Sequence, residues 1–246
     1  MPNGMMVMQL SIIIPVYNEE KRLPPTLEDI LKYLKTQKYD WEIVLVNDGS
    51  NDKTVEIVKK YQKKEKGIKL IDNKINQGKG AVVKQGMLES TGDWRLFMDA
   101  DNSTKLKEIG RFWPFMQDYP VIIGSRYIKG SKIITKQPLS RRILSRLGNL
   151  LTQIVLAPKI KDTQCGFKLF SKEFAEKIFS KVTLKRWSFD LEIFAICYSN
   201  NIKIKEVPVD WEEGKDSKLK IGRTAIRSFS ELLKTKIKQI KGLYKT

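Results

Sequence analysis

The sequence contains no histidine, only two cysteines and no long apolar run, and each shortage narrows what the protein can do. Without histidine, Ser-His-Asp and Cys-His nucleophilic catalysis are excluded, and any metal has to be held mainly by oxygen. Cys165 and Cys197 are too few for a disulfide framework, so we expect a reduced, intracellular protein. No run of about 18 apolar residues occurs, so we expect no transmembrane helix. Residues 1–9 also lack the apolar core of a signal peptide.

Acidic residues are scarce relative to basic ones. The chain has 46 Lys and Arg against 28 Asp and Glu, a net charge of +18, which attracts polyanions such as nucleic acid, anionic lipid or phosphorylated substrates. A nucleic-acid-binding protein is therefore one alternative. However, the sequence contains no known nucleic-acid motif and its basic residues are spread along the whole chain, so we expect no nucleic-acid partner. The length of 246 residues suits one large domain.

Apolar runs alternate with amphipathic segments through the first two thirds of the chain. The runs predict strands at Leu10–Pro15, Glu42–Asn47, Lys69–Asp72, Arg95–Met98 and Val121–Gly124. Helical spacing predicts helices at Leu23–Lys35, Asp52–Lys64, Gly80–Ser90 and Lys105–Met116. This order predicts an α/β fold with a mostly parallel sheet covered by helices on both faces. Ligands of such sheets bind beyond the carboxyl ends of the strands.

The last third is less regular. It predicts a helix at Phe189–Tyr198 and a short strand at Lys203–Val207. Two basic amphipathic helices are expected at Leu139–Ala157 and from Gly222 to the end. Their apolar stripes either lie in a membrane interface or pack on the domain, and the pattern alone does not decide between the two. Residues 211–246 are expected to form a helical extension of a domain that spans residues 1–210.

Two aspartates leave the predicted strand at Arg95–Met98, in the order Asp99-Ala100-Asp101. Side chains at i and i+2 of a strand point the same way, so these carboxylates repel each other unless a cation lies between them. Mg²⁺ is typically held by one or two carboxylates, with open positions for diphosphate oxygens. The pair therefore indicates either a metal site or a cap of the following helix.

Two weaker patterns lie at the same edge of the predicted sheet. Asp48 follows a strand and could accept hydrogen bonds from a base or a ribose, or form an Asx turn. Lys79 lies between Gly78 and Gly80 at the start of a helix, where anions are favoured, although the spacing is not that of a Walker A loop. Trp187 and Phe189 are expected in the core by default.

Seven segments, in order, resemble family 2 glycosyltransferases with the GT-A fold, and most of all the transferases that use polyprenyl phosphates: SIIIPVYNEE, EIVLVNDGSNDKT, NQGKGAVVKQGM, FMDADNST, IIGSRY, DTQCGFKLF and RWSFDLEI. They span roughly residues 11 to 193. The resemblance implies a Rossmann-like catalytic domain and Mg²⁺ or Mn²⁺. It also implies transfer of a hexose from a nucleotide sugar to a polyprenyl (dolichyl) phosphate, with inversion at the anomeric carbon.

The resemblance also implies roles for individual residues. The nucleoside pocket is expected to be lined by Pro15, Tyr17, Glu19 and Asp48, and the rest of the donor site by Lys79 and Ala100. Asp99 and Asp101 are expected to hold the metal. The acceptor phosphate is expected at Arg126, Arg141 and Ser145, and the sugar near Gln164 and Asp190. Asp101, Arg126 and Arg141 would be the catalytic residues.

Three points stay open: the donor, the acceptor and the contact with a membrane. Ser103 stands where the mannose synthases carry a glutamine, so UDP-glucose is favoured over GDP-mannose as the donor. A transferase with a sugar hydroxyl as acceptor would need a base, for which Asp190 and Glu192 are the candidates, whereas a lipid phosphate is already anionic and needs none. The basic helices favour peripheral contact with an anionic membrane, on its cytoplasmic face. We expect no N-terminal membrane anchor of the kind that the eukaryotic glucosyl enzymes carry.

Overall fold

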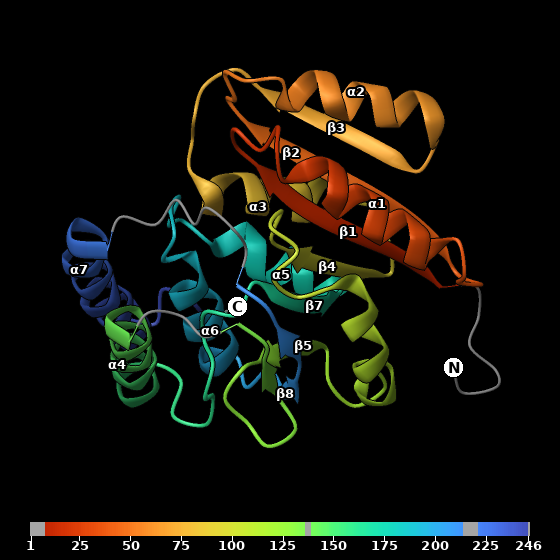
Figure 1. Ribbon diagram of the computed structural model, residues 1–246. Helices are drawn as coiled ribbons and strands as arrows, with labels where there is room; N and C mark the ends of the chain where they lie inside the picture. The colour runs from red at the N-terminus through yellow and green to blue at the C-terminus, as the bar shows by residue number, and fades with distance from the viewer. Residues whose placement is uncertain (1–7, 136–138, 214–220, 246) are drawn as a thin grey trace.

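A seven-stranded mixed sheet lies at the centre of the protein (Figure 1). The computed structural model describes residues 8–135, 139–213 and 221–245. The strand order is β3-β2-β1-β4-β7-β5-β8, and only β7 runs antiparallel to its neighbours β4 and β5. The strands are β1 (Gln9–Val16), β2 (Asp40–Asp48), β3 (Ile68–Asn73), β4 (Trp94–Met98), β5 (Val121–Ser125), β7 (Phe167–Ser171) and β8 (Ile204–Pro208). A second, two-stranded sheet pairs β6 (Lys132–Ile133) with β9 (Asp210–Trp211).

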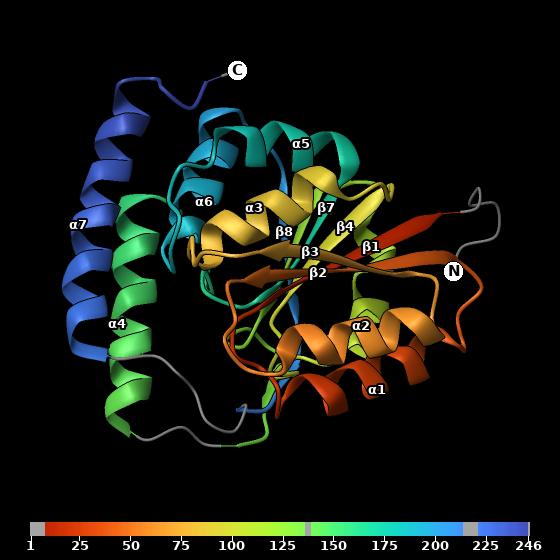
Figure 2. The same cartoon turned by 90° about the horizontal axis from the view of Figure 1, so that it is seen from above.

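Helices cover both faces of the large sheet, as Figure 2 shows. α1 (Leu23–Leu34) and α2 (Thr54–Lys64) lie on one face. The other face carries α3 (Lys79–Glu89), α5 (Lys172–Lys181) and α6 (Phe189–Ser199). α4 (Leu139–Val155) and α7 (Ile221–Ile240) lie side by side at one end of the molecule.

The continuous apolar runs follow from this sandwich of layers. Along β1, Ile12 and Ile14 belong to the core beneath α1, whereas Ile13 belongs to the core beneath α3. A strand that is buried on both faces carries mostly apolar side chains, so it reads as a nearly continuous apolar run rather than an alternating one. The predicted α/β fold is confirmed in its mostly parallel sheet and its two helical layers.

One local prediction was wrong, and two elements were missed. The helix expected at Lys105–Met116 consists of two 3-10 segments, Leu106–Arg111 and Trp113–Phe115. Pro114 has no N–H to donate to the carbonyl of Gly110, so it removes one hydrogen bond that a continuous α-helix would need. β7 and α5 were not predicted, because the fully buried Lys168 interrupts the apolar pattern of β7.

α4 and α7 present their apolar stripes outward. On their inner sides lie the buried polar residues Asn149, Thr152 and Thr235. The exposed stripe residues are Ile143, Leu147, Leu150 and Ile154 on α4 and Phe229, Leu233, Ile237 and Ile240 on α7. The residue-210 boundary falls within β9, and the division of the chain there stays a prediction. Both cysteines are buried and form no disulfide.

Candidate functional site

A cavity of about 820 Å³ opens beyond the carboxyl ends of β1, β2 and β4. Every predicted site residue except Arg141 lines it: Pro15, Tyr17, Glu19, Asp48, Lys79, Asp99, Ala100, Asp101, Arg126, Ser145, Gln164 and Asp190. Arg141 belongs to α4, but its side chain lies outside the part of the chain that the structure describes. Parallel strands bring these residues together because their carboxyl ends meet at one edge.

Asp48 holds the loop that leads into α3. Its carboxylate accepts hydrogen bonds from the backbone N–H groups of Gln77 (2.6 Å) and Gly78 (3.0 Å). Burial raises the pKa of Asp48, and these two hydrogen bonds oppose that effect. The Asx-type contact after β2 is made instead by Asn47, whose side-chain oxygen accepts the N–H of Ser50 (3.1 Å). Asp48 thus lines the cavity and fixes the backbone of the loop before α3.

Lys79 forms an ion pair with Asp99 at the start of α3. Its Nζ lies 2.5 Å from Asp99 Oδ1 and 4.6 Å from the centre of the Trp187 ring. Burial acts to lower the pKa of Lys79, but the carboxylates of Asp99, Asp190 and Asp101 raise it above its ordinary value. Lys79 is therefore held as a cation within a group of three acidic side chains.

Asp99 and Asp101 supply oxygen ligands of the kind that Mg²⁺ and Mn²⁺ prefer. Burial raises the pKa of Asp99, Lys79 opposes the rise, and the neighbouring charge of Asp101 adds to it. Asp101 Oδ1 accepts the N–H of Ser103 (3.0 Å). Across the described ranges, no group of three or more His, Cys, Asp or Glu side chains could hold a metal. Two carboxylates fit a Mg²⁺-type site that is completed by diphosphate oxygens and water.

The backbone of Gly166 passes directly beside Asp99. A Cβ at this position would collide with the Asp99 carboxylate, so a glycine is required by the close approach. The N–H of Asp99 donates to the carbonyl of Gly166 (3.2 Å). The antiparallel strand β7 that follows Gly166 thereby places the aspartate side chain at the cavity wall.

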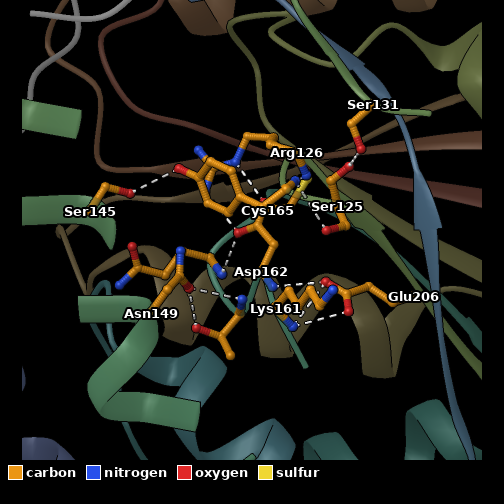
Figure 3. A network of polar contacts seen from close by, with 12 residues as sticks. Ser125, Arg126, Ser131, Ser145, Asn149, Lys161, Asp162, Cys165 and Glu206 are labelled. Carbon is orange, nitrogen blue, oxygen red and sulfur yellow. Dashed lines mark hydrogen bonds and ion pairs between the residues drawn. The ribbon is translucent and has the colours of Figure 1, made fainter. Parts of the chain in front are cut away.

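Arg126 is bound by a buried carboxylate (Figure 3). Its Nε donates to Oδ2 of Asp162 (2.7 Å) and its Nη2 donates to Oδ1 (2.9 Å). Asp162 is fully buried. Burial alone would raise the pKa of Asp162, but the Arg126 guanidinium and its hydrogen bonds lower it below its ordinary value. The backbone N–H of Asp162 donates to Glu206 (2.8 Å). The contact predicted between Arg126 and the acceptor phosphate stays a prediction. The ion pair between Arg126 and Asp162 was not predicted from the sequence.

Aromatic rings flank this arginine. Its guanidinium carbon lies 5.1 Å from the ring centre of Tyr127 and 5.5 Å from that of Trp211. On the α4 side, Arg146 lies 4.2 Å from the Tyr127 ring and Ser145 Oγ lies 3.4 Å from the Tyr127 hydroxyl. Tyr127 therefore joins the cavity wall at Arg126 to α4.

The two candidate bases of a hydroxyl-accepting transferase differ in position. Asp190 lines the cavity, and its Oδ1 lies 2.9 Å from Lys168 Nζ. Glu192 is fully buried outside the cavity lining and accepts from Thr183 N (2.5 Å) and Tyr244 Oη (2.7 Å). Glu192 therefore ties the end of the described chain to the loop before α6, where it cannot act as a base.

Sequence reasoning missed part of the cavity wall. Trp187 was expected in the core but is half exposed and lines the cavity, whereas Phe189 is buried as predicted. Further lining residues that were not predicted are Arg22, Asn76, Thr163, Arg186, Leu151, Trp211, Phe229 and Leu232. Asn76, Thr163 and Arg186 lie in the segments that resemble family 2 glycosyltransferases, whereas the others come from segments that only the tertiary fold brings together.

Comparisons with known proteins agree with this geometry. The family model for glycosyl transferase family 2 matches residues 11–179. A dolichyl-phosphate beta-glucosyltransferase of Dictyostelium discoideum is 37% identical over 96% of this chain and 76% of its own length. The enzyme of that name in Homo sapiens is 33% identical over 96% of this chain and 78% of its own.

The fold also has a solved counterpart. Glucosyl-3-phosphoglycerate synthase of Mycobacterium tuberculosis, in complex with Mn²⁺, UDP and glucosyl-3-phosphoglycerate, superposes with a TM-score of 0.71. The match covers 93% of this chain and 80% of that one, at 14% identity. At this identity the likeness concerns the fold alone, and it confirms the predicted GT-A architecture.

Proposed function

Since the chain belongs to glycosyl transferase family 2, we propose that it transfers glucose from UDP-glucose to a polyprenyl phosphate such as dolichyl phosphate, with inversion. The observation that carries this proposal is the cavity itself, which joins a cluster of carboxylates and cations to apolar walls made by α4 and α7. The names of the relatives, dolichyl-phosphate beta-glucosyltransferases, support both substrates' classes.

The donor would lie along the carboxyl edge of the sheet. Asp48 would accept hydrogen bonds from the nucleoside, and Asp99 and Asp101 would hold Mg²⁺ or Mn²⁺. The ion would neutralise charge on the leaving diphosphate. Lys79, held as a cation between three carboxylates, would add a second positive charge near the same oxygens.

The acceptor phosphate would attack from the side of Arg126. One of its oxygens forms the new bond to the anomeric carbon while the bond from that carbon to the diphosphate breaks, which inverts the configuration. A phosphate oxygen is anionic at neutral pH, so no side chain has to remove a proton. This agrees with the position of Glu192 away from the cavity and with the pairing of Asp190 to Lys168.

An apolar exit supports a lipid acceptor. Leu151 and Leu232 line the cavity between α4 and α7, and so do Leu147 and Phe229. The last two also belong to the exposed apolar stripes of these helices. A polyprenyl chain could therefore leave the cavity along a continuous apolar surface while its phosphate stays inside.

The same stripes support peripheral contact with an anionic membrane, on its cytoplasmic face. Ile154 is 71% exposed and Ile240 is 75% exposed, although both belong to helices whose inner sides are packed. Exposed basic residues on these helices include Arg142, Arg146 and Lys234. No helix within the described ranges is both long and apolar enough to span a bilayer.

The membrane contact predicts that the chain co-sediments with phosphatidylserine vesicles at low salt. The double variant Ile154→Ser/Ile240→Ser should bind at least about 10-fold more weakly, because each isoleucine in the interface contributes on the order of 1–2 kcal/mol. Ile75→Ser is the matched control, since Ile75 is 77% exposed but lies between β3 and α3 and belongs to neither apolar stripe. A parent chain that stays in the supernatant would end this proposal.

The donor and the acceptor are tested together. The purified chain is incubated with a membrane lipid extract, Mn²⁺ and either radiolabelled UDP-glucose or radiolabelled GDP-mannose. We expect glucose label in the organic phase, and its release by mild acid as expected for a sugar on a lipid phosphate. Mannose label there instead would establish the GDP-mannose-dependent alternative. Label that stays in water-soluble glycans would favour a sugar hydroxyl as the acceptor.

A further inference from the structure

Lys168 is a fully buried lysine at the centre of the sheet. It lies on β7, in register with Phe97 of β4 and with Ile123 of β5. Lysine is almost never fully buried unless it is paired, because removing an ammonium from water is costly. A lysine at this position therefore calls for a reason other than packing.

The ammonium of Lys168 has two partners. It donates to the carbonyl of Cys165 (2.5 Å) and lies 2.9 Å from Oδ1 of Asp190. The Phe194 ring, 6.0 Å away, closes the site from α6. The ammonium is thus fixed by the backbone on one side and holds a carboxylate on the other.

Lys168, Cys165 and Phe194 do not line the cavity, whereas Asp190 does. It lies in the first turn of α6, and its side chain is 14% exposed. Its charge acts on both Lys79 and Asp99, so it belongs to the same electrostatic cluster as the predicted metal and diphosphate site. A carboxylate can accept about four hydrogen bonds, so one contact with Lys168 leaves capacity for ligand hydroxyls.

We propose that Lys168 is a positioning residue that fixes the Asp190 carboxylate as a hydrogen-bond acceptor for hydroxyls of the transferred hexose. This inference rests on the proposed function, because it assumes a nucleotide sugar in the cavity. Lys168 does not touch the substrate. It holds the Asp190 carboxylate in one orientation, so that the hydroxyl contacts need no rearrangement when the donor binds.

The test compares ligands with and without the hexose. Dissociation constants of UDP-glucose and UDP are measured by calorimetry, with Mn²⁺, for the parent chain and for Lys168→Met. We expect Lys168→Met to weaken the binding of UDP-glucose about 10-fold, the effect of losing one hydrogen bond between the hexose and a correctly oriented Asp190 carboxylate, and to leave the binding of UDP unchanged. If Lys168 had a purely structural role, the dissociation constants of UDP-glucose and UDP would rise by the same factor. That result would overturn the proposal.

A matched control separates positioning from stability. Lys84 on α3 donates to the carbonyls of Ser180 and Val182 (3.2 and 2.8 Å) and does not line the cavity. Lys84→Met also removes hydrogen bonds from a lysine ammonium to backbone carbonyls. We expect this variant to bind UDP-glucose and UDP with the dissociation constants of the parent. Loss of UDP-glucose selectivity in this control as well would remove any special role of Lys168.

A second variant keeps the test decisive when Lys168→Met does not fold. Lys168→Met/Asp190→Asn removes both charges and should match Asp190→Asn alone, because Lys168 acts only through Asp190. A further selective loss in the double variant would contradict the proposal. The parent chain tests the hexose site separately. If the parent binds UDP-glucose and UDP equally well, the cavity has no hexose site, and the role proposed for Lys168 is rejected as well.

Discussion

Replacement of Asp101 with asparagine is expected to lower the rate of transfer about 10²–10³-fold while the fold remains intact. Asparagine keeps the size of the side chain and an oxygen that can accept the N–H of Ser103, the contact that Asp101 makes now. The negative charge is lost, and with it the ligand that would hold the metal against the leaving diphosphate. Loss of one preorganised electrostatic contact of this kind typically lowers the rate about 10²–10³-fold.

The measurement is the rate of label transfer to lipid, beside a thermal unfolding curve. Asp93→Asn is the matched control, because Asp93 precedes the same strand, β4, at its opposite end and accepts the N–H of Gln9. We expect the control to transfer glucose at the parental rate. Undiminished transfer by Asp101→Asn would refute the metal assignment at this residue.

The second large effect is on stability. Arg126→Ala leaves the carboxylate of Asp162 fully buried without its guanidinium partner. Breaking a buried pair from one side costs about 3–5 kcal/mol. For a chain of this size we expect the midpoint of thermal unfolding to fall by roughly 10 °C, which circular dichroism measures. Weaker use of the lipid acceptor by this variant therefore has to be judged at a temperature where it is folded.

Two controls accompany this variant. Arg227→Ala also removes an ion pair, with Glu231, but Arg227 is mostly exposed, so we expect a loss of less than about 1 kcal/mol. Arg126→Ala/Asp162→Asn removes both charges and should recover part of the lost stability. Equal unfolding midpoints of the parent and Arg126→Ala would show that the buried pair does not exist in solution.

The pH dependence follows from the sign of the shift. Because the folded-state pKa of Asp162 lies below its unfolded value, the pair stabilises the fold above the unfolded pKa of about 4. This contribution is lost as the pH falls through the folded-state pKa. The difference in stability between the parent and Arg126→Ala should therefore be full near neutral pH and shrink in acid.

The sequence predicted best what depends on neighbouring residues alone. Strands β1 and β2 were recognisable because both of their faces are buried, and the alignment of parallel strands then placed Asp48 and Asp99 in the wall of the same cavity. β7 escaped prediction because a charged residue, Lys168, interrupts its apolar pattern, and the charge is paired with a residue 22 positions further on, Asp190. Long-range pairing of this kind leaves no local signal.

The direction of an amphipathic helix was also beyond the sequence. The apolar spacing of α4 and α7 is the same whether the stripe faces the core or the surroundings. Only the structure shows Asn149 and Thr235 inside and Ile154 and Ile240 outside. The partner of Arg126 was hidden for a related reason, because Asp162 lies 36 residues away and meets it only once β5 is in place.

The most direct test of the donor site is a crystal structure of the chain with UDP-glucose and Mn²⁺, with anomalous diffraction recorded to locate the ion. We predict one manganese peak shared by Asp99, Asp101 and the diphosphate, with the uridine next to Asp48 and the glucose next to Asp190. A bound donor whose diphosphate lies elsewhere, with no manganese at either aspartate, would contradict the metal-dependent transfer described above.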